Sequence, residues 1–221
     1  MTIQQIFQAH GEAFAQGLKV TLQLALIIWA VGIIFGTLLG AAGARWRWSI
    51  GAPSKSISVL LAGMPALVFL FWMHYPLQAL LGIVVKPFIT AALTLSIINV
   101  FMVADLCRGA ISDFPTQYVW AARVCGLSET DTSLHIKFPI LLRQILPGLL
   151  LIQITMLQAT LFASLISVDE IFRAAQRVNS LVFKPVEIYS LLALAFLAVC
   201  VPLHLLALYL RRRFTRDISE R

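Results

Sequence analysis

The stretch that decides the fold is residues 20–44, which read VTLQLALIIWAVGIIFGTLLGAAGA and contain no Asp, Glu, Lys or Arg. A helix of about 20 apolar residues, rising about 1.5 Å per residue, crosses the roughly 30 Å hydrocarbon core of a bilayer. Four more runs lack charged residues in the same way: 56–85, 87–104, 144–168 and 188–210. The sequence therefore predicts a bundle of transmembrane helices.

The overall composition indicates the same class. Of the 221 residues, 60% are hydrophobic and 12% are charged, whereas ordinary soluble domains average roughly 45–50% and about 25%. One soluble core cannot hide this much apolar surface, so a soluble enzyme, a nucleic-acid-binding protein and a disordered chain are excluded. We expect a single all-α polytopic membrane domain over residues 1–221.

Charges and turn-forming residues divide this domain into five predicted spans. The spans cover about 18–44, 56–73, 87–107, 141–167 and 188–210. Two longer polar loops connect them, over 112–139 and 168–187. The run at 56–85 is too long for one straight crossing, so we expect one helix over 56–72 followed by an external turn.

Basic residues are unevenly distributed among the connecting segments. Of the 17 Lys and Arg, 12 fall in alternate segments on one side, including 112–139 and the C-terminal end, and five fall on the other. Because cytoplasmic loops are enriched in Lys and Arg, this predicts an outside N-terminus and a cytoplasmic C-terminus. The first run is longer than a signal-peptide core and lacks a basic leader, so we expect it to remain as a helix.

Three glycines recur every fourth residue in the first predicted span. Gly32, Gly36 and Gly40 share one face of a helix because four residues make slightly more than one turn. A face without side chains allows a second helix to approach closely. We expect these glycines to serve helix packing.

The loop over 112–139 has the pattern of two short helices. A helix over 116–125 is predicted to end at Gly126, and Ser128 followed by Asp131 resembles a capping box that opens a second helix. Pro139 is predicted to end that second helix at the entrance of the fourth span. A compact helical loop of this kind suits docking to a partner, although an ordinary connection would show similar caps.

The loop over 168–187 contains a second capping signal. Ser167 and Glu170 have capping-box spacing, which predicts a short outer helix that runs to about Val178.

Signatures of catalysis or metal binding are missing from the sequence. It contains no HExxH, no Gly-x-Ser-x-Gly and no phosphate-binding glycine loop. Cys107, Cys125 and Cys200 lack metal-site spacing, so we expect buried thiols rather than a zinc site or disulfides. The chain is therefore expected to be no enzyme and to hold no cofactor, and any ATP must be bound by another subunit.

One segment resembles a known family. Residues 120–128 read WAARVCGLS, and KFP follows at 137–139. This pattern is similar to the EAA loop of bacterial ABC importer permeases, in which Glu-Ala-Ala precedes a Gly and later a hydrophobic residue followed by Pro. In that family the loop inserts a coupling helix into a groove of the ATPase subunit.

The resemblance extends over nearly the whole chain. Segments 17–22, 63–65, 104–109 and 164–176 are similar to the polar amino-acid branch of these permeases. The resemblance implies a type I importer fold and assigns ATPase coupling to the following residues: Trp120, Ala121, Ala122, Gly126, Leu127, Ser128, Asp131 and Pro139. Trp120 replaces the first Glu of the motif, and we hypothesise that a second, different permease chain carries the fuller motif.

Polar residues inside the spans are candidates for the transport path. Exposing such groups to lipid costs free energy, so they face the bundle interior or a cavity. The candidates are Asn99, Gln153, Thr155, Gln158 and Thr160. Hydrogen bonding between helices is the alternative role for each of them. Asp105 and Arg108 are most simply an ion pair on one helical face, and competition by a zwitterionic substrate is the alternative.

The resemblance implies a function and a set of partners. The chain is expected to be the permease of an ATP-driven bacterial inner-membrane importer for polar amino acids or similar small solutes, working by alternating access. Its expected partners are a dimer of ABC ATPase subunits, a second permease chain, an extracytoplasmic solute-binding protein and membrane lipid, with no nucleic acid. A self-contained secondary transporter or a channel subunit is the alternative function.

Overall fold

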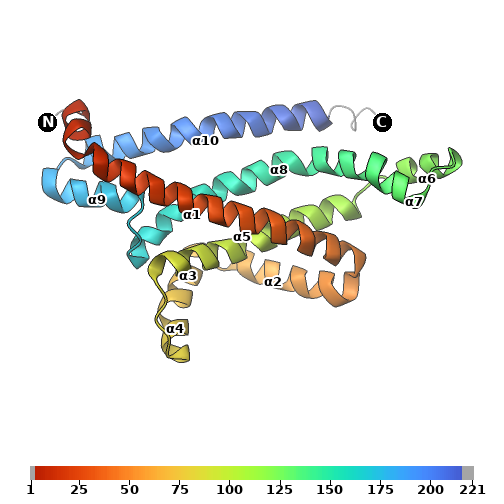
Figure 1. Cartoon of the computed structure of the whole chain (residues 1–221), viewed down its shortest axis with the longest axis horizontal. Helices are drawn as coiled ribbons and strands as arrows, with labels where there is room; N and C mark the ends of the chain where they lie inside the picture. Colours follow the sequence, from red (N-terminus) through yellow and green to blue (C-terminus); the bar gives the residue numbers. More distant parts are fainter. Residues whose placement is uncertain (1–2, 216–221) are drawn as a thin grey trace.

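The structure is a computed structural model that describes residues 3–215, and every regular element in that range is helical. Figure 1 shows an elongated bundle with α6 and α7 projecting from one end and α9 lying at the other. α1 begins near α9, and α10 ends at the opposite end of the bundle (Figure 1). The predicted all-α membrane fold is confirmed.

Four continuous helical segments are long and apolar enough to cross a membrane. They are α1 (Ile3–Arg45), α5 (Pro87–Ser112), α8 (Phe138–Ala159) with its 3₁₀ extension η3 (Thr160–Ile166), and α10 (Pro185–Thr215). α5 is central, because 56% of its most apolar stretch is buried within the chain, against 33% for α1 and 17% for α10. The outer helices therefore leave most of their apolar surface to lipid or to another chain.

The fifth candidate span is a bent pair of segments. A π-helical turn η1 (Arg47–Gly51) leads into α2 (Ala52–Gly63), and α3 (Ala66–His74) follows at a bend of 99°. The short helix α4 (Pro76–Leu81) completes the segment. The described part of the chain thus has four spans, or five if the bent pair counts as one.

The single helix predicted over 56–72 is wrong. The backbone leaves the helical region at Met64 (φ −104°, ψ 128°) and Pro65 (ψ 130°), so that α2 and α3 point in different directions. Proline has no N–H to donate and disfavours a helical conformation of the residue before it. The Gly63-Met64-Pro65 sequence therefore ends one helix and starts another.

The three spaced glycines of α1 lie against α5. A Cβ at Gly32 would lie 2.1 Å from Nδ2 of Asn99, and one at Gly36 would lie 2.6 Å from Cβ of Val103. A Cβ at Gly40 would meet the carbonyl oxygen of Ala104 at 2.7 Å. The two helix backbones can lie this close only because these positions carry no side chain.

The largest buried apolar cluster joins the central helices to the bent pair. Leu24 and Ile28 of α1, Leu70 of α3 and Leu95 of α5 are all fully buried in it. Ile166, at the end of η3, belongs to the same cluster. This packing holds α3 against the central helices.

Candidate coupling loop and transport groove

The turn between α6 (Thr116–Val124) and α7 (Glu129–Asp131) is built around a glycine. Gly126 has φ +75°, and its N–H donates to the carbonyl of Arg123 at 3.0 Å. The N–H of Leu127 donates to the carbonyl of Ala122 at 3.0 Å. This pair of bonds is the Schellman arrangement, in which a glycine takes the left-handed conformation at the end of a helix.

The second short helix begins at Ser128. The Ser128 hydroxyl accepts a hydrogen bond from the N–H of Asp131 at 3.1 Å, which is the N-cap expected from the sequence. Across the turn, the guanidinium of Arg123 pairs with the carboxylate of Glu129 at 3.0 Å. These bonds set the direction of α7 relative to α6.

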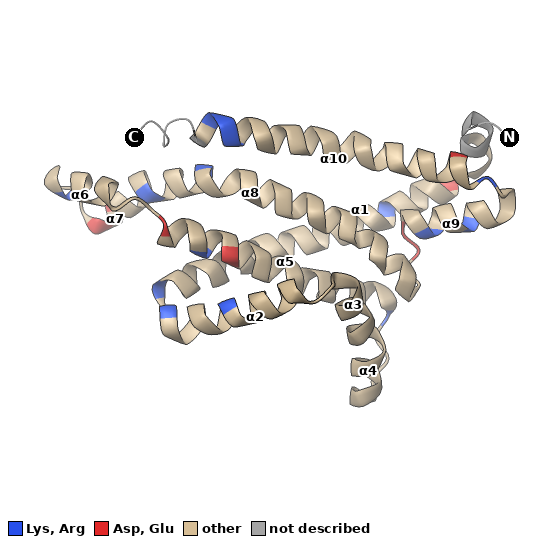
Figure 2. Cartoon of the chain, turned by 180° about the vertical axis from the view of Figure 1, so that it is seen from behind, with Lys and Arg blue, Asp and Glu red and all other residues tan. Residues whose placement is uncertain are grey.

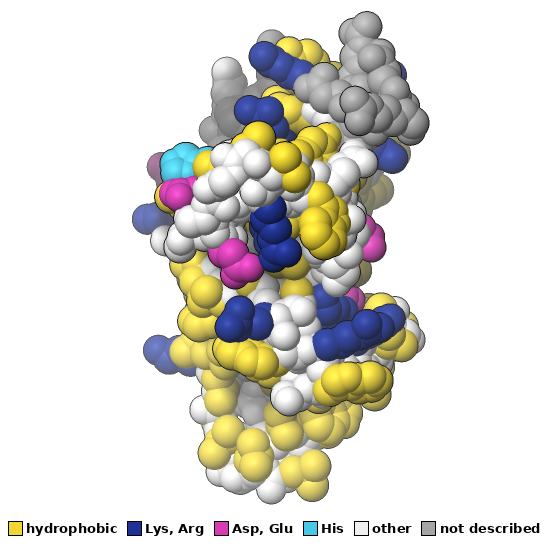
Figure 3. Space-filling model, turned by 90° about the vertical axis from the view of Figure 1, so that its right-hand side faces the viewer, with side chains coloured by type: hydrophobic (Ala, Val, Ile, Leu, Met, Phe, Trp, Pro, Cys, Tyr) yellow, Lys and Arg dark blue, Asp and Glu magenta, His cyan; other side chains and the backbone are white. Residues whose placement is uncertain are grey.

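The tip of this loop presents exposed apolar side chains. Trp120 is 63% exposed and Val124 is 88% exposed, while Ala122 on the same helix is buried. Arg123 lies 5.7 Å from the centre of the Trp120 ring. Figure 3 shows this end of the molecule, where hydrophobic side chains lie among Lys and Arg.

Two sequence expectations for this loop are wrong. Cys125 is exposed, because it caps α6 outside the bundle, although Cys107 and Cys200 are buried as expected. Pro139 does not end a helix: the π-helical turn η2 (Thr132–Lys137) runs directly into α8, with Pro139 in its first turn. Proline fits there because the first N–H groups of a helix lack a partner within the helix.

One continuous helix therefore connects the loop to the membrane. Residues Glu129–Ile166 form a single 38-residue helical segment that includes α7, η2, α8 and η3. The second half of the exposed loop, α7 and η2, is therefore continuous with the apolar span, and α6 is joined to it by the Gly126 turn.

The polar residues predicted for the transport path fall into two groups. In the first group, Asn99 and Gln153 bond to each other through their amides at 3.0 and 3.3 Å. Nδ2 of Asn99 also donates to the carbonyl of Ile28 at 2.8 Å, and Thr160 donates to the carbonyl of Leu157 at 2.7 Å. These three side chains are buried and satisfied within the helix bundle.

The second group lines an open groove. Thr155 and Gln158 are exposed and face a groove of about 650 Å³ between α2, α3, α5 and α8. Ser58 and Asp105 lie in its lining with apolar side chains such as Phe101. The structure thus separates the five predicted residues by the face of the helix that each occupies.

Ser54 and Ser58 were missed by the sequence analysis. The Ser58 hydroxyl donates to the carboxylate of Asp105, and the guanidinium of Arg108 pairs with the same carboxylate. Arg108 also donates to the Ser54 hydroxyl at 3.4 Å. The sequence spacing indicated such a contact. Two serines four residues apart share one face of α2, and the acid–base pair three residues apart shares one face of α5.

The outer loop contains a buried carboxylate. Glu170 caps α9 (Ile171–Val182), accepting hydrogen bonds from the N–H groups of Phe172 and Arg173, both at 2.9 Å. Burial raises the pKa of Glu170 to about 7, against the lowering effect of those bonds. Ser167, predicted as the cap, is instead in the left-handed conformation at the end of η3, so that prediction is wrong.

α9 packs directly on the start of α1. A Cβ at Gly17 would lie 2.9 Å from Cα of Ile171, and the N–H of Ile171 donates to the Thr21 hydroxyl at 3.1 Å. The capped end of α9 is therefore held against the first span. No cluster of three or more His, Cys, Asp or Glu suited to a metal ion occurs among the residues that the structure describes.

Curated relatives of the chain are transport permeases. The glutamine transport system permease protein GlnP of Escherichia coli is 27% identical over 90% of this chain and 91% of its own length. The histidine/lysine/arginine/ornithine transport system permease protein HisQ of Salmonella typhimurium is 27% identical over 93% of this chain and 94% of its own length. The octopine transport system permease protein OccM of Rhizobium meliloti is 27% identical over 80% of this chain and 76% of its own length.

Solved structures share the fold. An amino acid ABC transporter crystallised with histidines superimposes with a TM-score of 0.83 at 22% identity, covering 94% of this chain and 96% of that one. The inward-facing MetNI methionine ABC transporter superimposes with a TM-score of 0.65 at 16% identity, with the same coverage. Residues 21–216 match the family of binding-protein-dependent transport system inner membrane components. The chain belongs to that family and is an inner-membrane permease.

Proposed function

We propose that this chain is the permease subunit of an ATP-driven importer for polar amino acids or similar small solutes. The observation that carries the proposal is the continuous segment Glu129–Ile166, which joins an exposed helical loop to the wall of a mostly apolar groove that carries a few polar side chains. The names of the permeases similar to this chain, for glutamine and for basic amino acids, support this substrate class.

The exposed loop is the proposed docking site for the ATPase subunit. Trp120, Ala121, Val124 and Leu127 offer apolar surface at the tip of α6 and the following turn. Gly126, Ser128 and Asp131 shape the turn, and Ala122 anchors it. A short helix with an exposed apolar edge fits a groove in a partner protein. Movement of the ATPase subunits on binding ATP would then reach the membrane through Glu129–Ile166.

The groove is the proposed wall of the transport path. Thr155 and Gln158 offer hydrogen-bonding groups on an otherwise apolar surface that is open on one side of this chain. We propose that a second permease chain closes it. Asn99, Gln153 and Thr160 are reassigned to packing, because their hydrogen bonds are made within the bundle.

The charge distribution supports the proposed orientation. Figure 2 shows Lys and Arg on the C-terminal end of α10, the start of α8 and α2, all toward the end that carries α6 and α7. We propose that this end is cytoplasmic, in agreement with the positive-inside rule. α9 would then face outside, where Asp169 pairs with Arg173 at 3.2 Å and also with Arg177, forming a polar surface for a solute-binding protein.

Copurification tests the proposal. The chain should isolate in mild detergent with a stoichiometric P-loop ATPase. Val124→Asp on α6 and Leu134→Asp on η2, where Leu134 is 65% exposed, should abolish this association. Leu181→Asp on α9 is the matched control, because Leu181 is 68% exposed at the opposite end. A chain that purifies alone and takes up solute on a proton gradient without ATP would refute the importer and favour a secondary transporter.

A further inference from the structure

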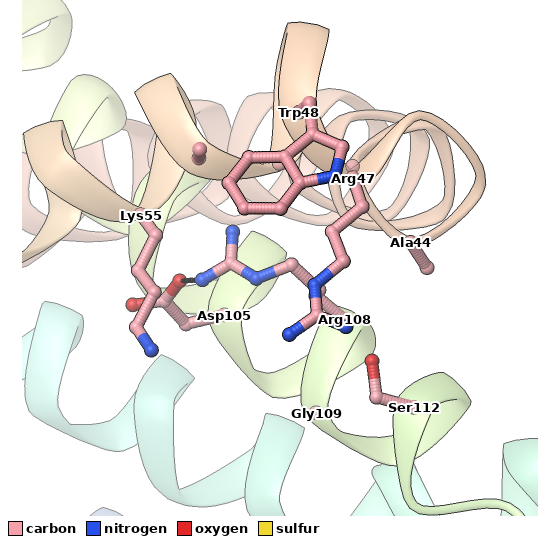
Figure 4. A pocket seen from close by; sticks show the side chains of 11 residues that line it. Ala44, Arg47, Trp48, Lys55, Asp105, Arg108, Gly109 and Ser112 are labelled. Carbon is pink, nitrogen blue, oxygen red and sulfur yellow. Dashed lines mark hydrogen bonds and ion pairs between the residues drawn. The ribbon is translucent and has the colours of Figure 1, made fainter.

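A basic pocket of about 700 Å³ adjoins the proposed transport groove, with which it shares Asp105. It is formed by the end of α1, by η1, by the start of α2 and by the last turns of α5. Arg47, Lys55 and Arg108 line it, together with the indole of Trp48. Figure 4 shows the guanidinium groups of Arg47 and Arg108 directed into the same space below the Trp48 ring.

The charges of this pocket are not balanced. Among the described residues that line it, Asp105 is the one carboxylate, and it is already paired with Arg108 and hydrogen-bonded by Ser58. Arg47 and Lys55 have no ion pair within the described residues. The lining therefore keeps two exposed positive charges, which favour the entry of an anion.

The flanking residues place the pocket at the surface of the membrane. Trp46 is 53% exposed and Trp48 is 82% exposed, and Arg45 lies 5.9 Å from the centre of the Trp46 ring. Trp and long cationic side chains concentrate where hydrocarbon meets the headgroups. An anion at this depth is most readily supplied by a lipid headgroup.

We propose that the pocket of Arg47, Lys55 and Arg108 binds the phosphate group of an anionic phospholipid. Guanidinium groups bind phosphate oxygens in a bidentate manner, and a Lys ammonium adds a point charge. Basic pockets between transmembrane helices are suited to lipid headgroups. A bound headgroup would bridge η1 and α5 and hold the two together. Inorganic phosphate offers the same chemistry and is the competing source.

Native mass spectrometry of the purified full-length chain tests this site. Phosphatidylglycerol and phosphatidylcholine are titrated separately into wild-type chain and into the double variant Arg47→Gln/Lys55→Gln. The variant should lose about 30-fold in apparent affinity for phosphatidylglycerol, the effect expected for two surface cations. Binding of phosphatidylcholine should not change. The double variant Arg45→Gln/Arg212→Gln removes two charges outside the pocket and should bind phosphatidylglycerol as the wild type does.

Further arms separate a lipid site from a free-anion site and from a protein contact. A charge-preserving double variant, Arg47→Lys/Lys55→Arg, should retain selective binding, which distinguishes loss of charge from misfolding. The proposal would be overturned if the control variant Arg45→Gln/Arg212→Gln lost as much affinity for phosphatidylglycerol as the pocket variant. Equal affinity of the wild type for both lipids would also overturn it. If excess inorganic phosphate alone abolishes the lipid adduct, the ligand is a free anion and the lipid assignment fails. If Arg47→Gln/Lys55→Gln keeps lipid but loses the copurifying ATPase subunit, the pocket is a protein contact instead.

Discussion

At the scale of single residues, the contact between α1 and α5 depends on the absence of a methyl group. Gly36 faces Val103 and the carbonyl of Val100, at 2.6 and 2.8 Å from the position a Cβ would take. Side chains in such a close-packed interface cannot move far without disturbing their own neighbours. The spacing between the helices is therefore set by the glycines.

The first prediction concerns this interface. Gly36→Ala should destabilise the chain by about 1–3 kcal/mol, because the added methyl group forces the two helices apart. The measurement is the midpoint of thermal unfolding in detergent. Gly109→Ala is the control, since nothing lies within 4 Å of a Cβ at that helical position. A Gly36→Ala chain as stable as the control would show that the interface tolerates the extra volume.

The second prediction separates packing from transport among two glutamines of α8. Gln153→Leu should lower stability by about 1 kcal/mol, because Asn99 loses a buried interhelical partner. Gln158→Leu should leave unfolding unchanged and alter the apparent affinity for solute, because Gln158 faces the groove. Unfolding midpoints and uptake into proteoliposomes that contain the whole transporter measure the two effects. The opposite pattern would reverse the two assignments.

At the scale of elements, the joint between α6 and α7 allows little choice of residue. The left-handed conformation of Gly126 is costly for a residue with a Cβ, particularly a β-branched one. No atom lies within 4 Å of a Cβ at this position, so the backbone alone restricts it. A substitution here changes the direction of the loop rather than its packing.

The third prediction follows from that restriction. Gly126→Val should reduce solute uptake at least severalfold while the membrane bundle stays folded, because the left-handed conformation costs about 1–2 kcal/mol or more. Uptake and thermal unfolding are measured on the same preparation. Gly126→Asn should retain most of the uptake, because Asn tolerates this conformation. Normal uptake by the Val variant would mean that the turn does not couple the loop to transport.

The fourth prediction concerns the joint between η3 and α9. The pKa of Glu170 is raised from 4.5 to about 7 in the folded chain. Between these two pH values the folded chain keeps a proton on Glu170, whereas the unfolded chain has released it. The stability that depends on this protonated carboxyl is fully present below about pH 4.5 and is lost as the pH rises through about 7. The free energy of unfolding falls by as much as about 3 kcal/mol over this range. Unfolding midpoints at pH 5 and pH 8 should therefore differ less for Glu170→Gln than for the wild type. An identical pH dependence in both chains would exclude this carboxyl as the cause.

At the scale of the whole molecule, apolar runs predicted the class and the approximate places of most of the long helices, since bilayer thickness limits helix length directly. The break at Met64 was missed because proline is tolerated inside transmembrane helices when neighbours satisfy the freed backbone groups. Leu70 is fully buried in the cluster shared with α1 and α5, so packing on those helices holds α3 after the bend. Such support from distant elements is not visible in local sequence.

Which polar residues of α8 face the groove was not predictable from the sequence for a similar reason. Gln153 and Gln158 are equally polar, but five residues rotate a helix by about 140° beyond one full turn, so they face different directions. Only the positions of α1 and α5 reveal which direction is the bundle interior. The turn between α6 and α7 was more predictable, because Gly126 and Ser128 act through local backbone geometry.

The fifth prediction belongs to the assembled transporter. Trp120 is exposed at the tip of the loop, at the position where the family has Glu, so Trp120→Glu should raise transport-coupled ATP hydrolysis by the complex. ATPase activity of the reconstituted transporter measures the effect. Gln117→Glu, at an exposed position about one turn earlier on α6, controls for the added charge. An unchanged rate would count against a weakened coupling motif in this chain.

The length of Glu129–Ile166 has a mechanical consequence. At a rise of about 1.5 Å per residue the segment measures about 57 Å, nearly twice the roughly 30 Å of hydrocarbon it crosses. If the segment rotates as a rigid body about its midpoint, a tilt of about 10° moves its two ends by about 5 Å in opposite directions. A single rotation could then narrow the passage on one side of the membrane while widening it on the other, without any change of secondary structure.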